Sequence, residues 1–411
     1  MVYRMKKVEL LAPAGNLEKL KMAITYGADA VYIGGEEYNL RAGADNFSEE
    51  DMKEGIEFAH ERNKKVYVTM NIIPHNSDLE GMAEYVEKLS KLGADAIILS
   101  DPGVYMIVKE TAPDMEIHLS TQANNTNWKS AMFWYKHGVK RVILARELSF
   151  SEIRGIREKC PDDLEFEIFV HGAMCISYSG RCLLSNYMAE RDSNRGMCAH
   201  PCRWKYYLME EKRPGEYFPV YENERGTFIF NSKDLCMIEY IPEIINLGVT
   251  SLKIEGRMKS SYYTATVVKA YREEIDRYYE DPSSYKFNPA QMDEISKASH
   301  REYTTGFYLS KPSGKDQVYK SSSYIREYDF VGLILDYDKK TGIAKVEQRN
   351  KMFEGDIVEI VNPKGGYFTQ RICNMKDEEY NDIQTAPHPQ MTVYMPVERE
   401  VERFSMIRRK V

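Results

Sequence analysis

The 411-residue sequence has no stretch that approaches the roughly 18 consecutive apolar residues of a membrane-spanning helix. Residues 1–8 also lack the apolar core and the small-residue cleavage site of a secretory signal. The chain does not have the shortage of apolar residues that keeps disordered chains unfolded, since 43% of its residues are hydrophobic and 29% are charged. We therefore expect a folded cytoplasmic protein that does not enter a membrane.

Several catalytic signatures are missing as well. No Gly-x-Gly-x-x-Gly follows the first strand-like run, where Leu11-Ala-Pro-Ala-Gly15 stands instead, so a dinucleotide-binding doubly wound sheet has little support. The chain contains neither the His-Glu-x-x-His of zinc proteases nor the Gly-x-Ser-x-Gly of serine hydrolases. The two best-known routes to a hydrolase are therefore without support.

Positive charge is not in excess, because the formal net charge is -7. This value argues against a protein that coats nucleic acid indiscriminately, so any RNA partner must be held by a local basic surface. Two runs combine basic and aromatic residues that could contact phosphates and stacked bases, although a solvated helix or strand face is the ordinary explanation. They are Arg203-Trp-Lys-Tyr-Tyr207 and Arg257-Met-Lys-Ser-Ser-Tyr-Tyr263.

The first 260 residues do contain short apolar runs separated by amphipathic helical stretches. Nearly all-apolar strands that alternate with helices are typical of parallel strands buried on both faces. A glycine followed by a buried run recurs at Gly27, Gly93, Gly138 and Gly248, and these four αβ half-units predict a TIM-type (β/α)8 barrel. The sequence has nine such runs and the barrel needs eight strands, so either 166–170 or 228–230 should lie outside the barrel. The nine runs are 8–11, 30–33, 66–70, 96–99, 117–119, 142–144, 166–170, 228–230 and 252–254.

The regular alternation fails between His171 and Thr227, where Cys, Arg, Tyr and Gly become frequent. We interpret residues 172–227 as an insertion at a strand end, which is where barrel enzymes carry their chemistry. The barrel with this insertion is expected to occupy residues 1–302, and residues 303–327 are expected to form a linker. From residue 328 to residue 411, short β runs with turns predict a small all-β barrel domain.

Seven cysteines are present, and five of them fall between residues 175 and 236. In a reducing compartment such a cluster indicates metal or redox chemistry rather than disulfides. No Cys-x-x-Cys pair of a zinc ribbon occurs, and the irregular gaps with small residues beside the sulfurs favour a 4Fe-4S iron-sulfur cluster. Zinc, cysteines packed as small hydrophobic residues, and a cysteine nucleophile are the alternatives. The favoured ligands are Cys175, Cys182, Cys198 and Cys236, with Cys202 as the alternative ligand.

Polar side chains follow several predicted strands, and in a parallel barrel they would converge over one mouth. Arg and Lys in that pocket could hold carboxylate or phosphate groups, which implies a small anionic substrate. Each residue taken alone is more often a helix cap, a turn former or an ion-pair partner, and only the recurrence at strand ends favours a site. The expected substrate-binding residues are Asn71, Gln122, Arg146, His171, Lys233 and Arg257. The candidates for catalysis are Glu147, Glu255 and Lys253, either glutamate serving as a general base.

Several motifs of the chain are specific to one family. They include Val170-His-Gly-Ala-Met-Cys-Ile-Ser-Tyr-Ser-Gly-Arg-Cys182, Asn231-Ser-Lys-Asp-Leu-Cys236, Lys253-Ile-Glu-Gly-Arg-Met-Lys259 and the opening Glu9-Leu-Leu-Ala-Pro-Ala-Gly15. With them the chain resembles peptidase family U32 over essentially its whole length. The family name records a collagenase-like protease assignment, whereas better understood members are iron-sulfur proteins that hydroxylate RNA or ubiquinone precursors. The Cys-rich insertion followed by a β domain most resembles the prephenate-dependent tRNA uridine hydroxylases.

The resemblance implies an enzyme that forms 5-hydroxyuridine at the wobble position of tRNA, with the cluster on the cysteines named above and prephenate as co-substrate. Prephenate is a dicarboxylate, so it would supply the anion, and Arg146 and Arg257 are the expected clamp. The C-terminal β domain, with Arg408-Arg-Lys410, would help to hold tRNA. A paralogous family subunit is a further candidate partner. A U32-type peptidase is the competing function, and a non-catalytic RNA-binding protein is the third.

Overall fold

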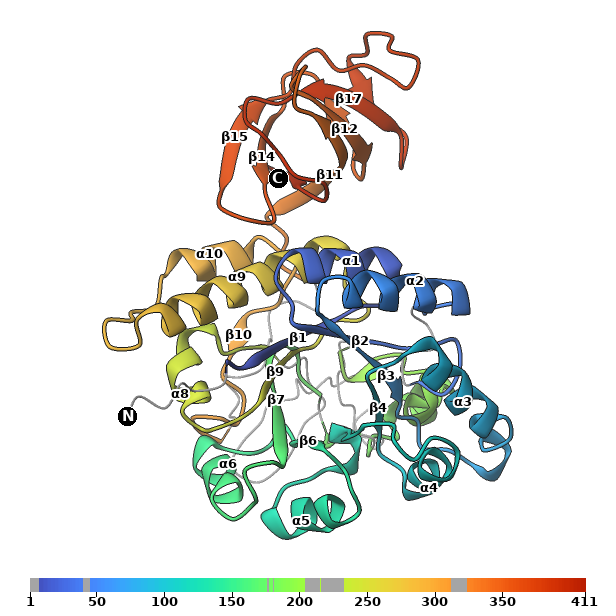
Figure 1. Cartoon of the computed structure of the whole chain (residues 1–411). Coiled ribbons are helices and arrows are strands. Elements are labelled where there is room, and N and C mark those ends of the chain that lie inside the picture. The colour runs from blue at the N-terminus through green and yellow to red at the C-terminus, as the bar shows by residue number, and fades with distance from the viewer. Residues whose placement is uncertain are drawn as a thin grey trace.

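The computed structural model describes residues 7–39, 45–175, 177–179, 181–203, 215, 233–311 and 324–411. Its centre is a ring of parallel strands, which are β1 (Glu9–Pro13), β2 (Ala30–Ile33), β3 (Lys65–Met70), β4 (Ala96–Leu99), β5 (Ile117–Leu119), β6 (Arg141–Ile143), β7 (Glu165–Ala173) and β9 (Ser251–Ile254). β9 pairs in parallel with both β7 and β1, so the ring is closed (Figure 1). The predicted TIM-type barrel is therefore confirmed.

Eight of the nine predicted apolar runs coincide with the strands of this ring. The run 166–170, one of the two that were expected to lie outside, forms the middle of β7. The run 228–230 lies outside the described residues. All four glycines of the repeated pattern have a positive φ, at +112° for Gly27, +87° for Gly93, +83° for Gly138 and +75° for Gly248. A side chain would strain this conformation, which explains why each helix-to-strand corner repeats a glycine.

Helices surround the ring as an outer layer (Figure 1). Several of them begin at a polar residue whose side chain accepts a backbone N–H of the first turn, as Asn16, Ser48 and Asp101 do. None of the described helices combines the length and the apolarity that crossing a bilayer requires. The helices of this layer are α1 (Leu17–Thr25), α2 (Glu49–His60), α3 (Met82–Leu92), α4 (Pro102–Thr111), α5 (Trp128–Lys136), α6 (Phe150–Arg157), α8 (Ile241–Ile245), α9 (Ser261–Glu280) and α10 (Ala290–Ser296).

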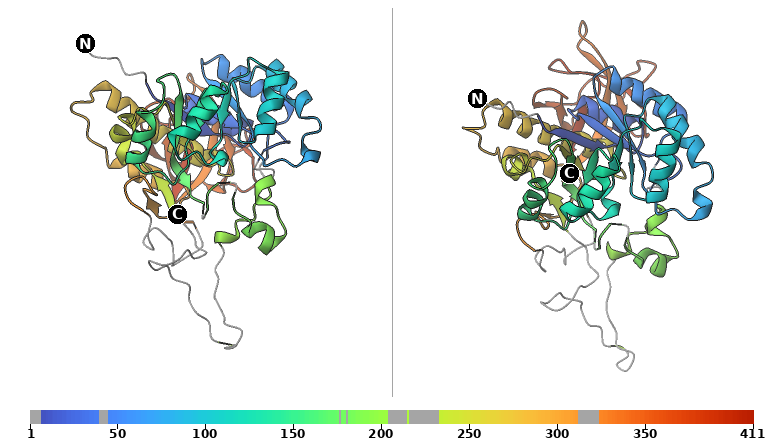
Figure 2. Two further views of the ribbon diagram at one scale, coloured as in Figure 1. Left: turned by 90° about the horizontal axis from the view of Figure 1, so that it is seen from below. Right: turned by 60° about the horizontal axis from the view of Figure 1, so that its bottom comes forward.

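The chain leaves the ring after β7. In the described part of the insertion, α7 (Leu184–Ala189) and two 3-10 turns (Ser193–Arg195 and Pro201–Arg203) lie beyond the carboxyl ends of the strands (Figure 2). β8 (Asp234–Cys236) then runs antiparallel to the end of β7, and β10 (Tyr303–Thr304) pairs with β8. The start of the predicted linker thus lies on the barrel, where the buried Tyr308 donates its hydroxyl to the Phe169 carbonyl at 2.6 Å.

The remaining residues form an antiparallel sheet in the order β15-β14-β18-β11-β12-β17, which curls around its own core (Figure 1). Gln370 links the two edge strands, since its amide donates to the Pro396 carbonyl at 3.1 Å and accepts the Glu398 N–H at 3.0 Å. The prediction of a C-terminal all-β domain is confirmed. Its strands are β11 (Tyr328–Asp338), β12 (Ile343–Gln348), β14 (Ile357–Val361), β15 (Tyr367–Arg371), β17 (Thr392–Pro396) and β18 (Met406–Lys410), with β13 (Met352–Phe353) paired to β16 (Thr385–Ala386).

The β domain packs on α1, α9 and α10, beside the barrel rather than over its mouth (Figure 1). Arg408 is fully buried at this interface, where its guanidinium pairs with Glu294 at 2.8 Å and with Glu359 at 2.6 Å. The expectation that Arg408 contacts tRNA is therefore wrong, because a guanidinium held between two carboxylates is not available to a phosphate. Lys410 of the same run is exposed.

Candidate functional site

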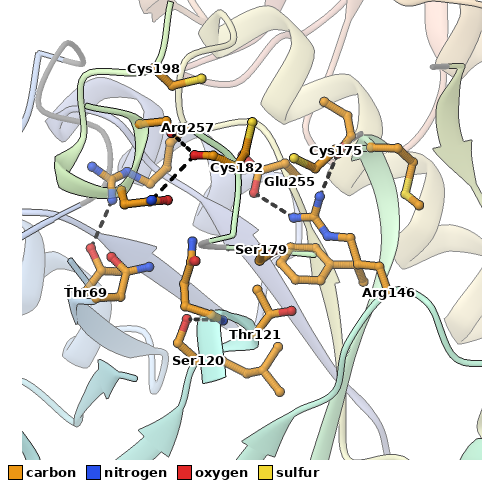
Figure 3. A pocket seen from close by; sticks show the side chains of 18 of the residues that line it. Thr69, Ser120, Thr121, Arg146, Cys175, Ser179, Cys182, Cys198, Glu255 and Arg257 are labelled. Carbon is orange, nitrogen blue, oxygen red and sulfur yellow. Dashed lines mark hydrogen bonds and ion pairs between the residues drawn. The ribbon is translucent and has the colours of Figure 1, made fainter. Parts of the chain in front are cut away.

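A pocket of about 160 Å³ opens at the carboxyl ends of the barrel strands (Figure 3). Thr69, Ser120 and Thr121 lie on the side formed by the barrel strands. Cysteines of the insertion lie on the opposite side. Of the residues predicted from the strand ends, the pocket is lined by Asn71, Gln122, Arg146, Lys253, Glu255 and Arg257. The barrel thus gathers side chains that are far apart in the sequence into one polar cavity.

Arg257 follows β9 and is 3% exposed. Its Nη1 donates to the Thr69 hydroxyl at 3.0 Å, and its Nη2 donates to Asn39 Oδ1 at 2.8 Å and to Asn46 Oδ1 at 2.9 Å. This hydroxyl and these two amide oxygens hold the guanidinium in a fixed position. Gly34 lies directly against this guanidinium, because a Cβ at that position would stand 2.4 Å from Nη2.

Arg146 reaches the pocket from the loop after β6. Its Nη1 donates to the Ala173 carbonyl at 2.8 Å, and Nη2 lies 3.5 Å from Glu255 Oε2. The guanidinium carbon is 3.9 Å from the centre of the Phe169 ring. A cation at this distance over an aromatic face is attracted to the ring. Two guanidinium groups, that of the buried Arg257 and that of the half-buried Arg146, therefore line one cavity from different loops. Such groups bind carboxylates in a fixed geometry.

The three candidates for catalysis occupy different environments. Lys253 lies at the bottom of the pocket, where its Nζ is 2.8 Å from Glu167 Oε1 and 4.4 Å from the centre of the Tyr32 ring. Glu255 lines the pocket beside Arg146. Glu147 is not among the lining residues, and burial raises the pKa of its carboxyl. Of the two glutamates, the structure thus brings Glu255 into the pocket.

Two predicted substrate-binding residues lie away from the pocket. His171 is 1% exposed, with the rings of Tyr263, Tyr271 and Tyr303 around it, and burial lowers the pKa of its imidazole to about 3. A register shift in the pairing of β7 with β9 falls between Phe169 and His171, and such a bulge re-aims the side chains that follow it. Lys233 pairs with Glu302 at 3.0 Å.

Four of the five clustered cysteines line the pocket: Cys175, Cys182, Cys198 and Cys202. Cys236 does not line it. That thiol is buried on β8, with its Sγ 4.0 Å from the Tyr271 hydroxyl, and burial raises its pKa to about 12. Of the four ligands that the sequence favours, three therefore line the pocket, together with the alternative Cys202.

The chemistry of this donor set suits an iron-sulfur cluster. Among the described side chains, no three of His, Cys, Asp or Glu are grouped closely enough to hold one metal ion. A zinc ion needs its sulfur ligands about 2.3 Å from a single point, whereas a 4Fe-4S cluster takes four thiolates around a much larger body. Thiols that line one side of a cavity from separate positions of the insertion fit the second arrangement.

Residues missed by the strand-end pattern complete the site. Tyr32, Ser179, Asn194 and His200 also line the pocket. The run 257–263 does not form a nucleic-acid surface as the sequence suggested, because Tyr262 and Tyr263 are 5% and 2% exposed. In the other basic run, residues 204–207 lie outside the described residues.

Comparison with known proteins agrees with this architecture. The family model described as "Peptidase family U32" matches residues 15–318, and "Peptidase family U32 C-terminal domain" matches residues 326–408. The chain is 45% identical over 404 residues to "tRNA hydroxylation protein P1" of Bacillus subtilis (strain 168), covering 98% of this chain and 95% of the relative. It is 39% identical over 440 residues to "tRNA hydroxylation protein P" of Escherichia coli (strain K12), covering 97% and 95%.

A relative with a different name matches the chain over a similar length. The "Collagenase" of Porphyromonas gingivalis (strain ATCC BAA-308 / W83) is 31% identical over 404 residues, covering 96% of this chain and 95% of the relative. Both family models and full-length relatives thus span the barrel, the insertion and the β domain. The chain belongs to peptidase family U32.

Proposed function

We propose that this protein is a cytoplasmic tRNA hydroxylase that forms 5-hydroxyuridine at the wobble position, with a 4Fe-4S cluster and with prephenate as co-substrate. The printed names of the two relatives that are 45% and 39% identical support the assignment of tRNA hydroxylation. The observation that carries the proposal is the shared cavity, in which thiols from the insertion face guanidinium groups from the barrel.

Cys175, Cys182 and Cys198 would each bind the cluster through a thiolate, and Cys202 or Cys236 would supply the fourth ligand. When bound, the cluster would supply one-electron chemistry next to the base. Prephenate carries two carboxylates, and the pocket offers two guanidinium groups, those of Arg146 and Arg257. Arg257, which hydrogen bonds hold in a fixed position, would orient one carboxylate. Glu255 would fix the direction of Arg146 toward the other.

A peptidase is the second candidate, because one full-length relative is named a collagenase. Peptide hydrolysis requires either an activated nucleophile or a metal-bound water. If the same cysteines held zinc instead of an iron-sulfur cluster, the site would suit hydrolysis. Metal content therefore separates the two functions.

The first experiment is to measure iron, acid-labile sulfide and zinc on protein purified without oxygen, together with its visible spectrum. We expect about four irons and four sulfides per chain with broad visible absorption. The same sample, given unmodified tRNA and prephenate, should then produce 5-hydroxyuridine, detected by mass spectrometry of the nucleosides. One zinc without iron, or peptide cleavage that persists through repeated purification, would contradict the proposal.

A substitution at Gly34 tests whether Arg257 binds a carboxylate of prephenate, and it does so without removing any charged group. In Gly34→Ala the new methyl group would meet the Arg257 guanidinium, which its three hydrogen bonds hold in place, so the guanidinium has to move. Because hydrogen bonds to a charged group contribute about 1.5–3 kcal/mol each, we expect the KM for prephenate to rise roughly ten- to a hundredfold. Iron content should stay the same.

Gly155→Ala is the matched control for this variant, since nothing lies within 4 Å of a Cβ at that position of α6. The control should leave the KM unchanged. An unchanged KM for prephenate in Gly34→Ala would remove Arg257 from the proposed clamp.

A further inference from the structure

Large apolar side chains are exposed on the segment of the insertion that carries the pocket-lining cysteines. The exposed fractions are 45% for Tyr178, 70% for Leu183, 85% for Tyr187, 40% for Met188 and 44% for Met197. Apolar side chains scattered singly over a surface need no explanation, whereas a group of them on one short segment marks an interaction site.

Three of these side chains are direct sequence neighbours of residues that line the pocket. Tyr178 precedes Ser179, Leu183 follows Cys182, and Met197 precedes Cys198. Ser179, Cys182 and Cys198 all point into the cavity region (Figure 3). The exposed side chains and the lining residues therefore belong to the same segment of the chain.

The same segment carries a local excess of positive charge. Between residues 177 and 203 it has four arginines against Glu190 and Asp192, which gives +2 within a chain of net charge -7. Arg181 and Arg191 are exposed, and within the described part of the chain neither guanidinium has a hydrogen-bond or ion-pair partner. Asp192, by contrast, accepts the Asn194 N–H at 2.9 Å. The unpaired guanidinium groups are thus available to an external anion.

We propose that this surface, the insertion rim (Tyr178, Arg181, Leu183, Tyr187, Arg191 and Met197), receives a single-stranded loop of the RNA substrate and presents one base to the pocket. The proposal rests on the proposed function and adds the surface by which the RNA is held. Proteins recognise RNA loops by stacking splayed bases on aromatic rings or guanidinium planes and by contacting phosphates with Arg. The rim supplies both kinds of group.

The composition of the rim favours RNA over a protein partner. The centre of a protein–protein interface is depleted of charged residues. In the rim, however, unpaired arginines stand beside the aromatic and aliphatic side chains, with Arg181 between Tyr178 and Leu183. The segment that carries the rim also lies beyond the carboxyl ends of the barrel strands, whereas the β domain packs beside the barrel (Figures 1 and 2).

The test uses the full-length protein with its cluster and, as probe, an unmodified tRNA transcript with uridine at the wobble position. Affinity is measured by fluorescence anisotropy over a range of salt concentrations. Tyr187→Ala should weaken binding about tenfold, since stacking of one base contributes on this scale. Tyr187→Phe, which keeps the ring, should restore it. The double variant Arg181→Gln/Arg191→Gln should make the slope of log K against log salt shallower by about 1.4, at about 0.7 for each phosphate contact on a single strand.

Two variants on the β domain serve as matched controls. Tyr380→Ala removes a tyrosine that is 59% exposed, and Lys340→Gln removes an exposed cation. Neither should change the affinity or the salt slope. Iron content and circular dichroism of all variants should equal those of the unaltered protein.

Unchanged RNA affinity in both rim variants would overturn the proposal, whatever the protein does to tRNA. Loss of self-association in Tyr187→Ala, seen by light scattering with RNA affinity intact, would overturn it in favour of a contact between copies of this chain. Failure of the cluster-loaded protein to hydroxylate tRNA, with binding still dependent on Tyr187, would instead overturn the proposed function alone.

Discussion

Replacing Cys175 by Ser should give a colourless protein that has lost nearly all of its iron and sulfide and no longer hydroxylates tRNA. Cys175 lines the pocket beside three other cysteines, and a serine hydroxyl is a poor substitute for a thiolate at an iron site. Iron analysis, the visible spectrum and nucleoside mass spectrometry on one preparation check the result. A colourless Cys175→Ser protein that modified tRNA at the full rate would exclude the cluster from the reaction.

Cys373→Ser is the matched control, since Cys373 is an exposed cysteine of the β domain. It should keep its iron and its activity. The comparison of Cys202→Ser with Cys236→Ser identifies the fourth ligand, because only the variant that lacks it should lose iron. Cys202 lines the pocket, while Cys236 is buried beside Tyr271.

Replacing Arg141 by Met should destabilise the barrel more than any other single change considered for this protein. Arg141 is 3% exposed at the amino-terminal end of the barrel interior, where its guanidinium lies 2.6 Å from Glu9, 2.7 Å from Glu165 and 3.2 Å from Glu167. Removing one partner of a buried ion pair costs about 3–5 kcal/mol, because a charge is left without compensation. We expect a loss of this size in the free energy of unfolding, measured by urea titration.

The loss should depend on pH. Burial alone would raise the pKa of Glu9, but the charge of Arg141 and its hydrogen bonds outweigh burial and hold the pKa below its usual value of 4.5. In the unaltered protein this carboxylate therefore stabilises the fold above its unfolded pKa, and the contribution is lost as the pH falls through the lowered pKa. In Arg141→Met, only the hydrogen bonds from Tyr67 and Ser251 still oppose the effect of burial, so the pKa of Glu9 should rise. The difference in stability between the two proteins should therefore be largest near neutral pH and should shrink in acid.

Arg154→Met is the control for Arg141, because Arg154 is exposed on α6. A surface change of this kind alters the free energy of unfolding by less than about 0.5 kcal/mol. Equal stability of the two variants at neutral pH would show that the buried network does not stabilise the barrel.

The barrel could be predicted because its signals are local. A buried parallel strand is a short apolar run, and the corner before it needs a residue with positive φ, which the glycines at 27, 93, 138 and 248 provide. The ends of such strands meet at one mouth whatever their order, so Asn71, Gln122, Arg146 and Arg257 could be assigned to one pocket without knowledge of their contacts.

The other features of the site depend on local irregularities and on contacts between residues far apart in the chain, which the spacing of residues in the sequence does not reveal. His171 follows the predicted apolar run, but β7 continues to Ala173, and the bulge before His171 turns the imidazole toward a cluster of tyrosines. Arg408 belongs to a basic run typical of an RNA contact, yet two carboxylates of separate elements enclose it. Gly34 has no side chain that could mark it as a binding residue, and its role follows from the guanidinium that lies against it.

The order of strands in the β domain has a consequence for synthesis on the ribosome. β18 lies in the middle of the sheet and pairs with both β14 and β11. Until residues 406–410 have emerged, the strands on either side of this gap cannot join, whereas every strand of the barrel ring has been made by residue 254. Because domains fold as units during synthesis, the nascent barrel must stay soluble without the β domain over α1, α9 and α10. A ribosome stalled shortly before residue 406 would therefore display a finished barrel tethered to an unfinished sheet with two open edges.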